Sequence, residues 1–334
     1  MKILKFGGTS VANSKNLDLV SDIVASEKET SVIVVSALGG ITDLLILALN
    51  KAAKGENNFT QILEEIEQRH LEPIRSSIPS TKQSGIISFL KSELNRLETI
   101  LEGVMMLREV TSKATAKVSG YGERLSSTII FEIFKHKGFD IILKDGRELI
   151  ETQIQNKRLV INWKNTEFKT KEFFKTNTAK ITLVPGFVAR NEEGTTTTLG
   201  RGGSDFSAAV LAHVLDSISL EIWTDVSGMY TANPKIVTQA RPIPKLSYLE
   251  AMELSHFGAK VIFPPTLQPL VEKEIPVYIK NTFAPQDQGT KIDSKISKQN
   301  GTVVKGISHI DQISLISLEG SGMVGIPGFS KRLF

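Results

Sequence analysis

The sequence predicts an α/β protein with an open, mainly parallel sheet sandwiched by helices. The first observation is a repeated order of short strand, glycine-rich turn and amphipathic helix, seen in residues 3–27, 32–53 and 195–216. The second is that the strand segments are continuous apolar or β-branched runs, which is typical of parallel strands buried on both faces. The third is size, because 334 residues with 40% apolar content can bury a substantial core.

Composition excludes several classes of protein. The 40 basic and 36 acidic residues are spread along the chain, so a net charge of +4 gives little support to nucleic-acid binding. There is no cysteine, which removes disulfides, thiolate metal sites and cysteine nucleophiles. Neither the N-terminus nor residues 44–49 form an apolar run long enough for a signal peptide or a membrane span. We therefore expect a soluble, cytoplasmic protein with no membrane partner.

The first half of the chain follows the repeated plan and then departs from it. Residues 3–6 and 32–35 are predicted strands, and each is followed by a glycine turn and a helix. The first helix is expected over residues 14–27. The second is expected to begin with Thr42 as its cap and to run to residue 53. From residue 59 to 111 the apolar residues recur at spacings of three and four positions, with a break at Pro79. This pattern predicts an inserted helical pair that covers the sheet and pairs with a second subunit.

The second half returns to alternating strands and helices. A glycine turn at 119–123 is expected to lead into a helix up to residue 136. Predicted strands follow at 140–144, 158–162, 181–189, 195–199, 218–223 and 276–280, with helices at 165–175, 247–254 and 266–271. Residues 191–194 predict a hairpin turn, and Ser247 is the expected cap of its helix.

The stretch from Thr195 to Asp216 contains the most informative turn. Gly200, Gly202 and Gly203 allow a tight turn with Arg201 projecting from it; Ser204 is the expected N-cap and Asp205 lies in the first helical turn. Such a loop presents free amides and the positive end of a helix to an anion. It matches neither of the two commonest phosphate motifs.

The C-terminal region is polar and then returns to strands. Residues 284–301 are rich in Gly, Lys, Gln and Ser and are the best candidate for a linker. Residues 303–308 and 312–318 are predicted strands. The run at 320–325 is a formal G-x-G-x-x-G, but no second strand or acidic residue follows it, so it is a weak dinucleotide signal.

Five polar or glycine-rich turns lie where strands end or helices begin, at residues 7–10, 37–42, 119–123, 200–205 and 224–228. In a parallel sheet these ends gather at one edge, where such folds bind ligands. The turns carry cations, glycines, hydroxyls and carboxylates: Lys5, Gly7, Gly8, Thr9, Ser10, Gly39, Gly40, Thr42, Glu123, Arg201, Gly202, Gly203, Ser204, Asp205 and Asp225. This set suits phosphoryl oxygens, Mg²⁺ and a substrate ammonium, and it predicts phosphoryl transfer from a nucleotide.

Another chemistry fits these turns less well, and several of the residues also have a simpler interpretation. No histidine lies near these turns, which disfavours a Ser-His-Asp hydrolase. Lys5 could equally be a surface lysine, Glu123 a helix-start residue favoured by the dipole, and Asp225 a turn former. Spacing alone gives Tyr230, Lys235 and Lys260 no role.

Together these residues resemble the aspartokinases of the amino-acid kinase superfamily over residues 1–283, with similarity to a regulatory ACT module after the linker. The motifs that carry the resemblance are Lys5-Phe6-Gly7-Gly8-Thr9-Ser10, Ser36-Ala37-Leu38-Gly39-Gly40-Ile41-Thr42, Gly122-Glu123, Thr198-Leu199-Gly200-Arg201-Gly202-Gly203-Ser204-Asp205, Trp223-Thr224-Asp225-Val226-Ser227-Gly228 and Phe257-Gly258-Ala259-Lys260-Val261. Their order and spacing are specific, although no single one would be.

The resemblance implies the amino-acid kinase fold and the ATP-dependent phosphorylation of the side-chain carboxylate of L-aspartate, the first step towards lysine, threonine and methionine, with Mg²⁺. It assigns catalysis to Lys5 and Asp205, and aspartate binding to Thr42, Glu123, Arg201 and Ser204. It assigns the nucleotide to Lys5, Gly7, Gly8, Ser10, Thr224, Asp225, Tyr230, Lys235, Lys260 and Val261. It leaves the Mg²⁺ ligands open, and it implies a homo-oligomer, dimer or higher, with a feedback amino acid acting on the full-length protein.

The chain departs from the family pattern at two places. Asn233-Pro234-Lys235 stands where the family usually has Asp-Pro-Arg, so the nucleotide contact would be single-pronged. Phe263-Pro264 stands where His-Pro is usual. The resemblance divides the chain into a kinase domain (1–283), a linker (284–301) and an incomplete ACT-like module (302–334), as expected of a piece of a longer monofunctional or bifunctional enzyme.

Two alternatives stay open at this point. One is a kinase of the same fold acting on glutamate, acetylglutamate, carbamate or a nucleoside monophosphate; Glu123 argues for a substrate with a free ammonium. The other is a non-catalytic amino-acid sensor, against which intact Lys5, Arg201 and Asp205 argue.

Overall fold

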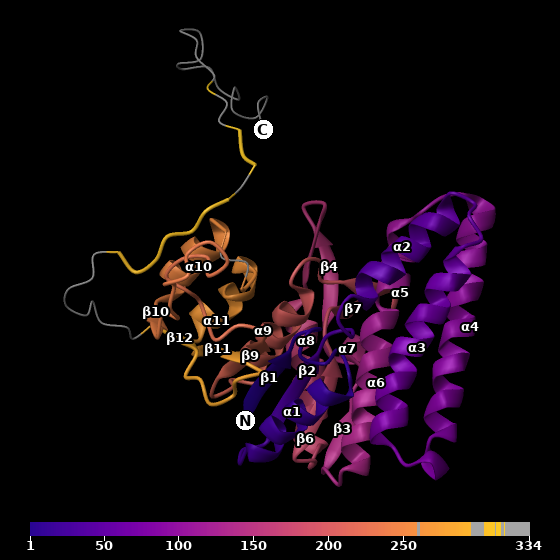
Figure 1. Cartoon of the computed structure of the whole chain (residues 1–334), viewed down its shortest axis with the longest axis horizontal. Coiled ribbons are helices and arrows are strands. Elements are labelled where there is room, and N and C mark those ends of the chain that lie inside the picture. Colours follow the sequence, from indigo (N-terminus) through magenta and orange to yellow (C-terminus); the bar gives the residue numbers. More distant parts are fainter. Residues whose placement is uncertain (259–260, 295–303, 311, 315–316, 318–334) are drawn as a thin grey trace.

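The structure is a computed structural model that describes residues 1–258, 261–294, 304–310, 312–314 and 317. Its centre is a sheet of eight strands in the order β10-β12-β11-β9-β1-β2-β6-β3. Every neighbouring pair in this sheet is parallel except β11 with β12. The prediction of an open, mainly parallel sheet between helices is confirmed, and Figure 1 shows the sheet between the α2–α6 helices and the α10–α11 region.

The strands of the central sheet are short and mostly buried. Their bounds are β1 (Lys2–Phe6), β2 (Ser31–Val35), β3 (Ile141–Leu143), β6 (Ile181–Pro185), β9 (Leu220–Thr224), β10 (Lys245–Leu246), β11 (Val277–Asn281) and β12 (Thr290–Ile292). A second sheet has the order β5-β4-β7-β8. It consists of β4 (Glu151–Gln155), β5 (Arg158–Ile161), β7 (Val188–Asn191) and β8 (Thr196–Thr198), and the predicted β7–β8 hairpin is confirmed.

Helices cover both faces of the central sheet. Their bounds are α1 (Ser14–Ser26), α2 (Ile41–Ala53), α3 (Phe59–Ser77), α4 (Ser84–Leu107), α5 (Ser112–Ser119), α6 (Tyr121–His136), α7 (Gly146–Leu149), α8 (Trp163–Thr176), α9 (Gly203–Val214), α10 (Tyr248–His256) and α11 (Gln268–Glu272), with single 3₁₀ turns at Ser80–Lys82 and Pro264–Thr266. No helix within the described ranges is long and apolar enough to cross a bilayer.

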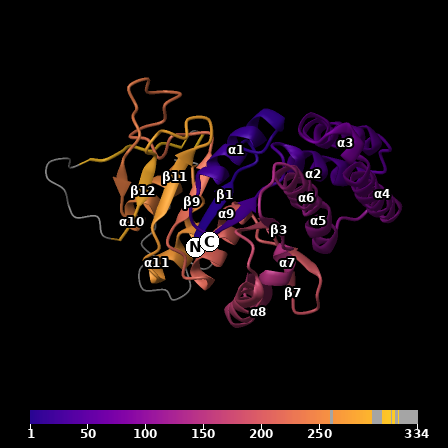
Figure 2. The ribbon, with the colours of Figure 1, turned by 90° about the horizontal axis from the view of Figure 1, so that it is seen from below.

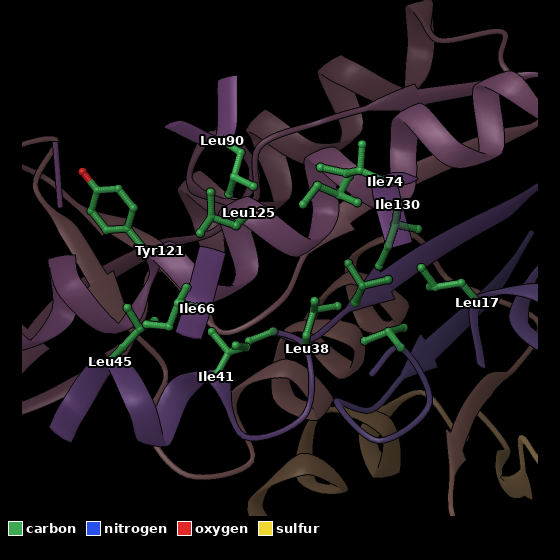
Figure 3. Packing of buried hydrophobic residues seen from close by; sticks show 14 of the residues in the cluster. Leu17, Leu38, Ile41, Leu45, Ile66, Ile74, Leu90, Tyr121, Leu125 and Ile130 are labelled. Carbon is green, nitrogen blue, oxygen red and sulfur yellow. The ribbon is translucent and has the colours of Figure 1, made fainter. Parts of the chain in front are cut away.

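Alternation along β1 and β2 divides the core into two layers. Leu4, Phe6, Ile33 and Val35 join the core formed with α1 to α4 and α6. The apolar residues of the alternate positions, Ile3, Val32 and Val34, pack in the other core with α9 to α11. Figure 3 shows part of the first core, with Leu38, Ile41 and Leu45 facing side chains of α3 and α6. In Figure 2 α1 and α8 lie on opposite sides of the sheet.

The predicted helical pair at 59–111 is confirmed as α3 and α4. Both bury an apolar stripe, and the chain breaks at Pro79 as predicted. The predicted turn at 119–123 is wrong, because Gly120 has helical φ and ψ of −67° and −12° and joins α5 directly to α6. The predicted single strand at 181–189 is two strands, β6 and β7, which are separated by Gly186 and Phe187.

The predicted linker at 284–301 contains a strand. Thr290 and Ile292 are fully buried, and β12 pairs with β10 and β11. The Thr290 Oγ1 atom donates to the Ile243 carbonyl at 2.7 Å, which ties this segment into the sheet. Polar composition therefore misled the sequence interpretation, whereas the division of the chain near residue 283 stays a prediction.

The strands predicted at 303–308 and 312–318 are not found in residues 304–308, 312–314 and 317. The remaining positions of both segments, and the glycine motif at 320–325, lie outside the described residues, as does most of the predicted module at 302–334. Residues 304–310 run over α10: the Ile307 N–H donates to the Thr231 carbonyl at 2.8 Å, and Lys305 pairs with Glu250.

Ser247 begins α10 with a capping box. Its Oγ accepts from the Glu250 N–H at 3.3 Å, and the Glu250 carboxylate accepts from the Ser247 N–H at 2.8 Å. We expect Ser247→Ala to lower the free energy of unfolding by about 1 kcal/mol, because the Glu250 amide loses its acceptor. Urea unfolding measures this. The control is Ser84→Ala, an exposed serine at the start of α4 with no cap bond; equal losses in both variants would contradict the assignment.

Candidate active site

Three of the predicted turns, at residues 7–10, 37–42 and 224–228, follow strands that end at one edge of the central sheet. Phe6 lies beside Val35 and Trp223, Val35 lies beside Pro185, and Thr224 lies beside Asn281, so these strands end together. The loops that follow them therefore surround one space.

A cavity of about 570 Å³ opens at this edge. Seven predicted site residues line it, and they come from β1 and the turn after it, from α2 and α6, and from the start of α9 and the turn before it: Lys5, Gly8, Thr42, Glu123, Arg201, Ser204 and Asp205. Residues far apart in sequence are thus brought into one site. Gly7, Ser10, Thr224, Asp225, Tyr230, Lys235 and Val261 do not line this cavity.

Lys5 and Asp205 form an ion pair at the base of the cavity. The Lys5 Nζ atom lies 2.6 Å from Asp205 Oδ1, and the two side chains are 10% and 14% exposed. β1 supplies the lysine and the first turn of α9 supplies the aspartate. A largely desolvated cation is thereby held where an anionic ligand would enter.

The first glycine turn packs against the second. A Cβ atom at Gly8 would lie 2.9 Å from the Ala37 carbonyl oxygen, so no side chain fits there. The Gly7 N–H donates to the Trp223 carbonyl at 3.1 Å, whereas the Gly8 N–H has no acceptor within the described part of the chain. The Gly8 amide is therefore free to donate to a ligand.

Glu123 is a buried carboxylate with an unused oxygen. Its side chain faces the cavity from the first turn of α6, is 4% exposed, and its Oε2 atom has no hydrogen-bond partner among the described residues. Burial raises the pKa of Glu123 from 4.5 to about 7, against the opposing effects of backbone amides and Lys5. Such a group gains most from a ligand that brings a positive charge.

Arg201 projects from a turn that needs glycine on both sides. Gly200 and Gly202 have φ of 73° and 66°, and a Cβ at Gly202 would lie 2.5 Å from that of Phe263. The Arg201 side chain is exposed and has no polar partner in the described ranges. It is available to bind an anionic group.

Both predicted helix caps at the site are wrong. α9 begins at Gly203 after Gly202, so Ser204 lies inside the helix, and α2 begins at Ile41 after Gly40, so Thr42 lies inside it. In both cases the cap residue is a glycine with positive φ, a conformation that serine and threonine rarely adopt. The two hydroxyls remain free to face the cavity.

The residues predicted to bind the nucleotide lie mainly outside this cavity. Thr224 ends β9 and Asp225 follows it, Tyr230 bridges to Pro242, and Lys235 is exposed. Val261 lines a neighbouring cavity of about 1050 Å³, which shares Arg201, Gly202 and Asp205 with the first. Lys260 lies outside the described residues.

Ser10 is fully buried beneath the turn. Its Oγ lies 2.7 Å from Thr282 Oγ1 and 3.3 Å from the Trp223 carbonyl oxygen. The hydroxyl therefore ties the first turn to the end of β11, and direct contact of Ser10 with a nucleotide stays a prediction.

Sequence reasoning missed several cavity residues, among them Phe187 and Asp43. Phe187 has φ of 66°, and its N–H is held by Ser207 Oγ at 2.9 Å. It was hidden inside an apolar run, and only the preceding Pro185-Gly186 pair signals a turn. Asp43 follows Thr42 in α2 and adds an exposed carboxylate to the rim.

Comparisons with known proteins agree with this geometry. The sequence pattern described as "Amino acid kinase family" matches residues 1–281. A bifunctional aspartokinase/homoserine dehydrogenase of Haemophilus influenzae is 35% identical over 340 residues, which cover 100% of this chain and 41% of that protein. The chain spans less than half the length of the bifunctional relatives it matches.

Solved structures point the same way. Aspartokinase III of E. coli in complex with aspartate and ADP superimposes with a TM-score of 0.82 and 29% identity, covering 89% of this chain and 65% of the other. The same enzyme in complex with lysine and aspartate gives a TM-score of 0.80 at 29% identity, with coverages of 89% and 66%.

Proposed function

The chain belongs to the amino acid kinase family, and from that premise we propose that it transfers the γ-phosphoryl group of ATP to the side-chain carboxylate of L-aspartate. The products would be 4-phospho-L-aspartate and ADP. The observation that carries the proposal is the buried, partnerless Glu123 carboxylate in a cavity that also holds Lys5, Arg201 and Asp205.

The proposed acceptor matches the charges of the cavity. Glu123 pairs with the substrate ammonium, and Arg201 binds a carboxylate through its forked donors. Thr42 and Ser204 add hydroxyl contacts. An acetylated amino acid, carbamate or a nucleoside monophosphate brings no ammonium and would leave the Glu123 charge buried without compensation, which favours a free amino acid.

The proposed chemistry requires no general base. The attacking carboxylate of aspartate is ionised at neutral pH, so an oxygen of this group bonds to the γ-phosphorus as the bond to the β-phosphate oxygen breaks. Two anions must be brought together. Lys5 and the Gly8 amide neutralise the charge of the transferring group, while Asp205 holds Lys5 in place.

The nucleotide would lie beside this cavity. Thr224 ends the neighbouring strand and Asp225 follows it, and we propose that they bind the nucleotide together with Gly7, Ser10, Tyr230, Lys235, Lys260 and Val261. Val261 lines the larger cavity that meets the first at Asp205. The transferred phosphoryl group would then pass at the junction of the two cavities.

Magnesium would arrive with the nucleotide. No group of three or more metal-ligating side chains occurs among the residues that the structure describes, which fits an ion held mainly by phosphates and one or two carboxylates. Asp205 is the carboxylate at the junction. When bound, the ion supplies positive charge to the phosphate oxygens.

Arg201→Lys is expected to raise the KM for aspartate by about tenfold with a smaller change in kcat, because a bidentate fork becomes a point charge. Steady-state kinetics at saturating ATP measures this. Arg158→Lys, an exposed arginine of β5, is the matched control. An unchanged KM in Arg201→Lys would refute its contact with the substrate.

An ADP-release assay tests the proposed function. It compares L-aspartate with L-glutamate, N-acetyl-L-glutamate and no acceptor. We expect aspartate alone to stimulate ADP release well above the rate without acceptor. Equal stimulation by N-acetyl-L-glutamate would contradict the role of Glu123, and no stimulation by any acceptor would favour a sensor.

Regulation and assembly follow as further parts of the proposal. A structure of the E. coli enzyme contains lysine together with aspartate. We propose that a feedback amino acid acts on the full-length protein of this chain, through a module that follows the kinase domain (residues 1–283). A homo-oligomer in the cytoplasm is proposed with it; size-exclusion chromatography with light scattering measures the assembly.

A further inference from the structure

A third cavity, of about 420 Å³, lies on another face of α6 from Glu123. Its walls come from α4, α5, α6 and α7 and from strands of both sheets, which lie together in Figure 1. Its volume is within the range of about 300–1,000 Å³ that is typical of sites for small ligands. None of the residues assigned to the kinase reaction lines it.

Three cationic side chains face this cavity, and two of them have unused donors. Arg147 is paired with Asp145 and donates to Thr196. Arg124 makes one side-chain bond, from Nη2 to Glu93 Oε1 at 3.1 Å, and Arg96 shares that oxygen. Lys117 is exposed and has no partner in the described part of the chain. The unused donors favour an anion.

Tyr121 adds a neutral donor. The residue is 7% exposed, lines the cavity, and has no hydrogen-bond partner for its hydroxyl within the described ranges. Burial raises the pKa of this hydroxyl, so it stays protonated and can donate at neutral pH. A hydroxyl that has no protein partner and lines the cavity can donate to a ligand that accepts its proton in a hydrogen bond.

The lining also includes four apolar residues, Phe89, Leu143, Pro185 and Val188. Two carboxylates line the cavity as well, and both are already paired: Asp145 with Arg147, and Glu148 with Lys144. We propose that this cavity binds a small organic anion, with a carboxylate or phosphate head group between Lys117, Arg124 and Tyr121 and an apolar body against Phe89, Leu143 and Val188. The head group supplies acceptors for the unused donors, and the body removes apolar surface from water.

Three elements line both this cavity and the catalytic one. α6 carries Tyr121 and Glu123, α5 carries Lys117 and Ser119, and β8 carries Thr196 and Thr198. The Ser126 hydroxyl ties α6 to the Ser36 carbonyl at 2.8 Å. An anion bound to the first turn of α6 is therefore expected to change the KM for aspartate; this regulatory effect rests on the proposed function, whereas the binding does not.

Isothermal titration of the whole chain tests the site, with 3-phenylpropanoate as the carboxylate probe and inorganic phosphate as the second probe. Saturable binding of either probe supports the site, and the two titrations together identify the preferred head group. Lys117→Ala and Tyr121→Phe should each weaken binding by about tenfold, because the first removes a charged donor and the second removes a hydroxyl donor. Lys113→Ala, a 71% exposed lysine of the same helix, is the matched control and should leave binding unchanged.

The catalytic cavity also accepts anions, so Lys5→Ala is titrated in parallel. Binding that survives in Lys5→Ala and weakens in Lys117→Ala supports the proposal. Binding that is lost in Lys5→Ala but retained in Lys117→Ala places the anion in the catalytic cavity and overturns it. Absence of binding of both probes up to about 10 mM overturns it as well. These outcomes need no turnover and do not depend on the proposed reaction.

Discussion

Replacing Lys5 by alanine is expected to lower kcat by about 100- to 1000-fold while the KM for ATP rises by less than about tenfold. Lys5 lies at the end of β1, 2.6 Å from Asp205, with 10% of its side chain exposed. A cation that is so well shielded from water acts mainly on the charge that develops as the phosphoryl group is transferred. It contributes little to binding that is equally strong in the ground state and the transition state.

Steady-state kinetics at varied ATP measures both effects. Lys2→Ala is the matched control, because Lys2 lies at the other end of β1 and pairs with Glu27 and Glu221, away from the cavity. It should leave kcat unchanged. A Lys5→Ala variant that keeps its kcat but loses ATP affinity would show that Lys5 binds the nucleotide and does not act on the transferring group.

Glu123→Gln is expected to change stability and substrate binding in opposite directions. In the folded chain the pKa of Glu123 is about 7, against 4.5 as the ordinary value. Between these pH values the folded state holds a proton that the unfolded state releases, so the stability of the wild type falls as the pH rises through this window. Above pH 7 the free energy of unfolding of the wild type is lower by about 3 kcal/mol than it is below pH 4.5. The Glu123→Gln variant, which has no charge to bury, does not show this decrease.

Substrate binding responds the other way. Glutamine cannot pair with an ammonium as a carboxylate does, so the KM for aspartate should rise by about ten- to a hundredfold at pH 8. In the wild type the KM should also rise as the pH falls below about 7, because Glu123 becomes protonated. The variant should lack this pH dependence.

Urea unfolding at pH 5 and pH 8, with the KM for aspartate across the same range, measures the pair of effects. Glu132→Gln, on the same helix and outside the cavity, is the control and should change neither. A Glu123→Gln variant that is no more stable than the wild type at pH 8 and binds aspartate normally would remove Glu123 from the site.

The central part of the fold could be predicted from the sequence because local and tertiary signals agree there. The apolar runs of β1 and β2, the spacing in α3 and α4, and the capping box of α10 each indicate the element that forms. The convergence of turns was also predictable, because parallel strands end at a shared edge. That logic places Lys5 and the Gly8 turn correctly, whereas Glu123 reaches the same space from a helix that follows another helix, and Arg201 follows a strand of the second sheet.

The errors arise where tertiary contacts override local composition. β12 lies in a polar segment, yet Thr290 is buried because its hydroxyl bonds to the Ile243 carbonyl. Thr42 and Ser204 are good cap residues by type, but the positive φ at the caps requires glycine. The cavity of about 420 Å³ beside α6 has no sequence signature. Its polar residues (Lys117, Tyr121 and Arg124) meet Leu143 and Val188 only when α6 packs against the edge of the sheet.

Trapping of the acyl phosphate with hydroxylamine tests the central claim most directly. Incubated with ATP, Mg²⁺ and L-aspartate, the chain should form aspartyl hydroxamate in proportion to the ADP released, and Lys5→Ala should lower the rates of both by about 100- to 1000-fold. L-glutamate and N-acetyl-L-glutamate should give no hydroxamate. ADP release without hydroxamate, or equal hydroxamate from L-glutamate, would contradict phosphorylation of the aspartate side chain at this site.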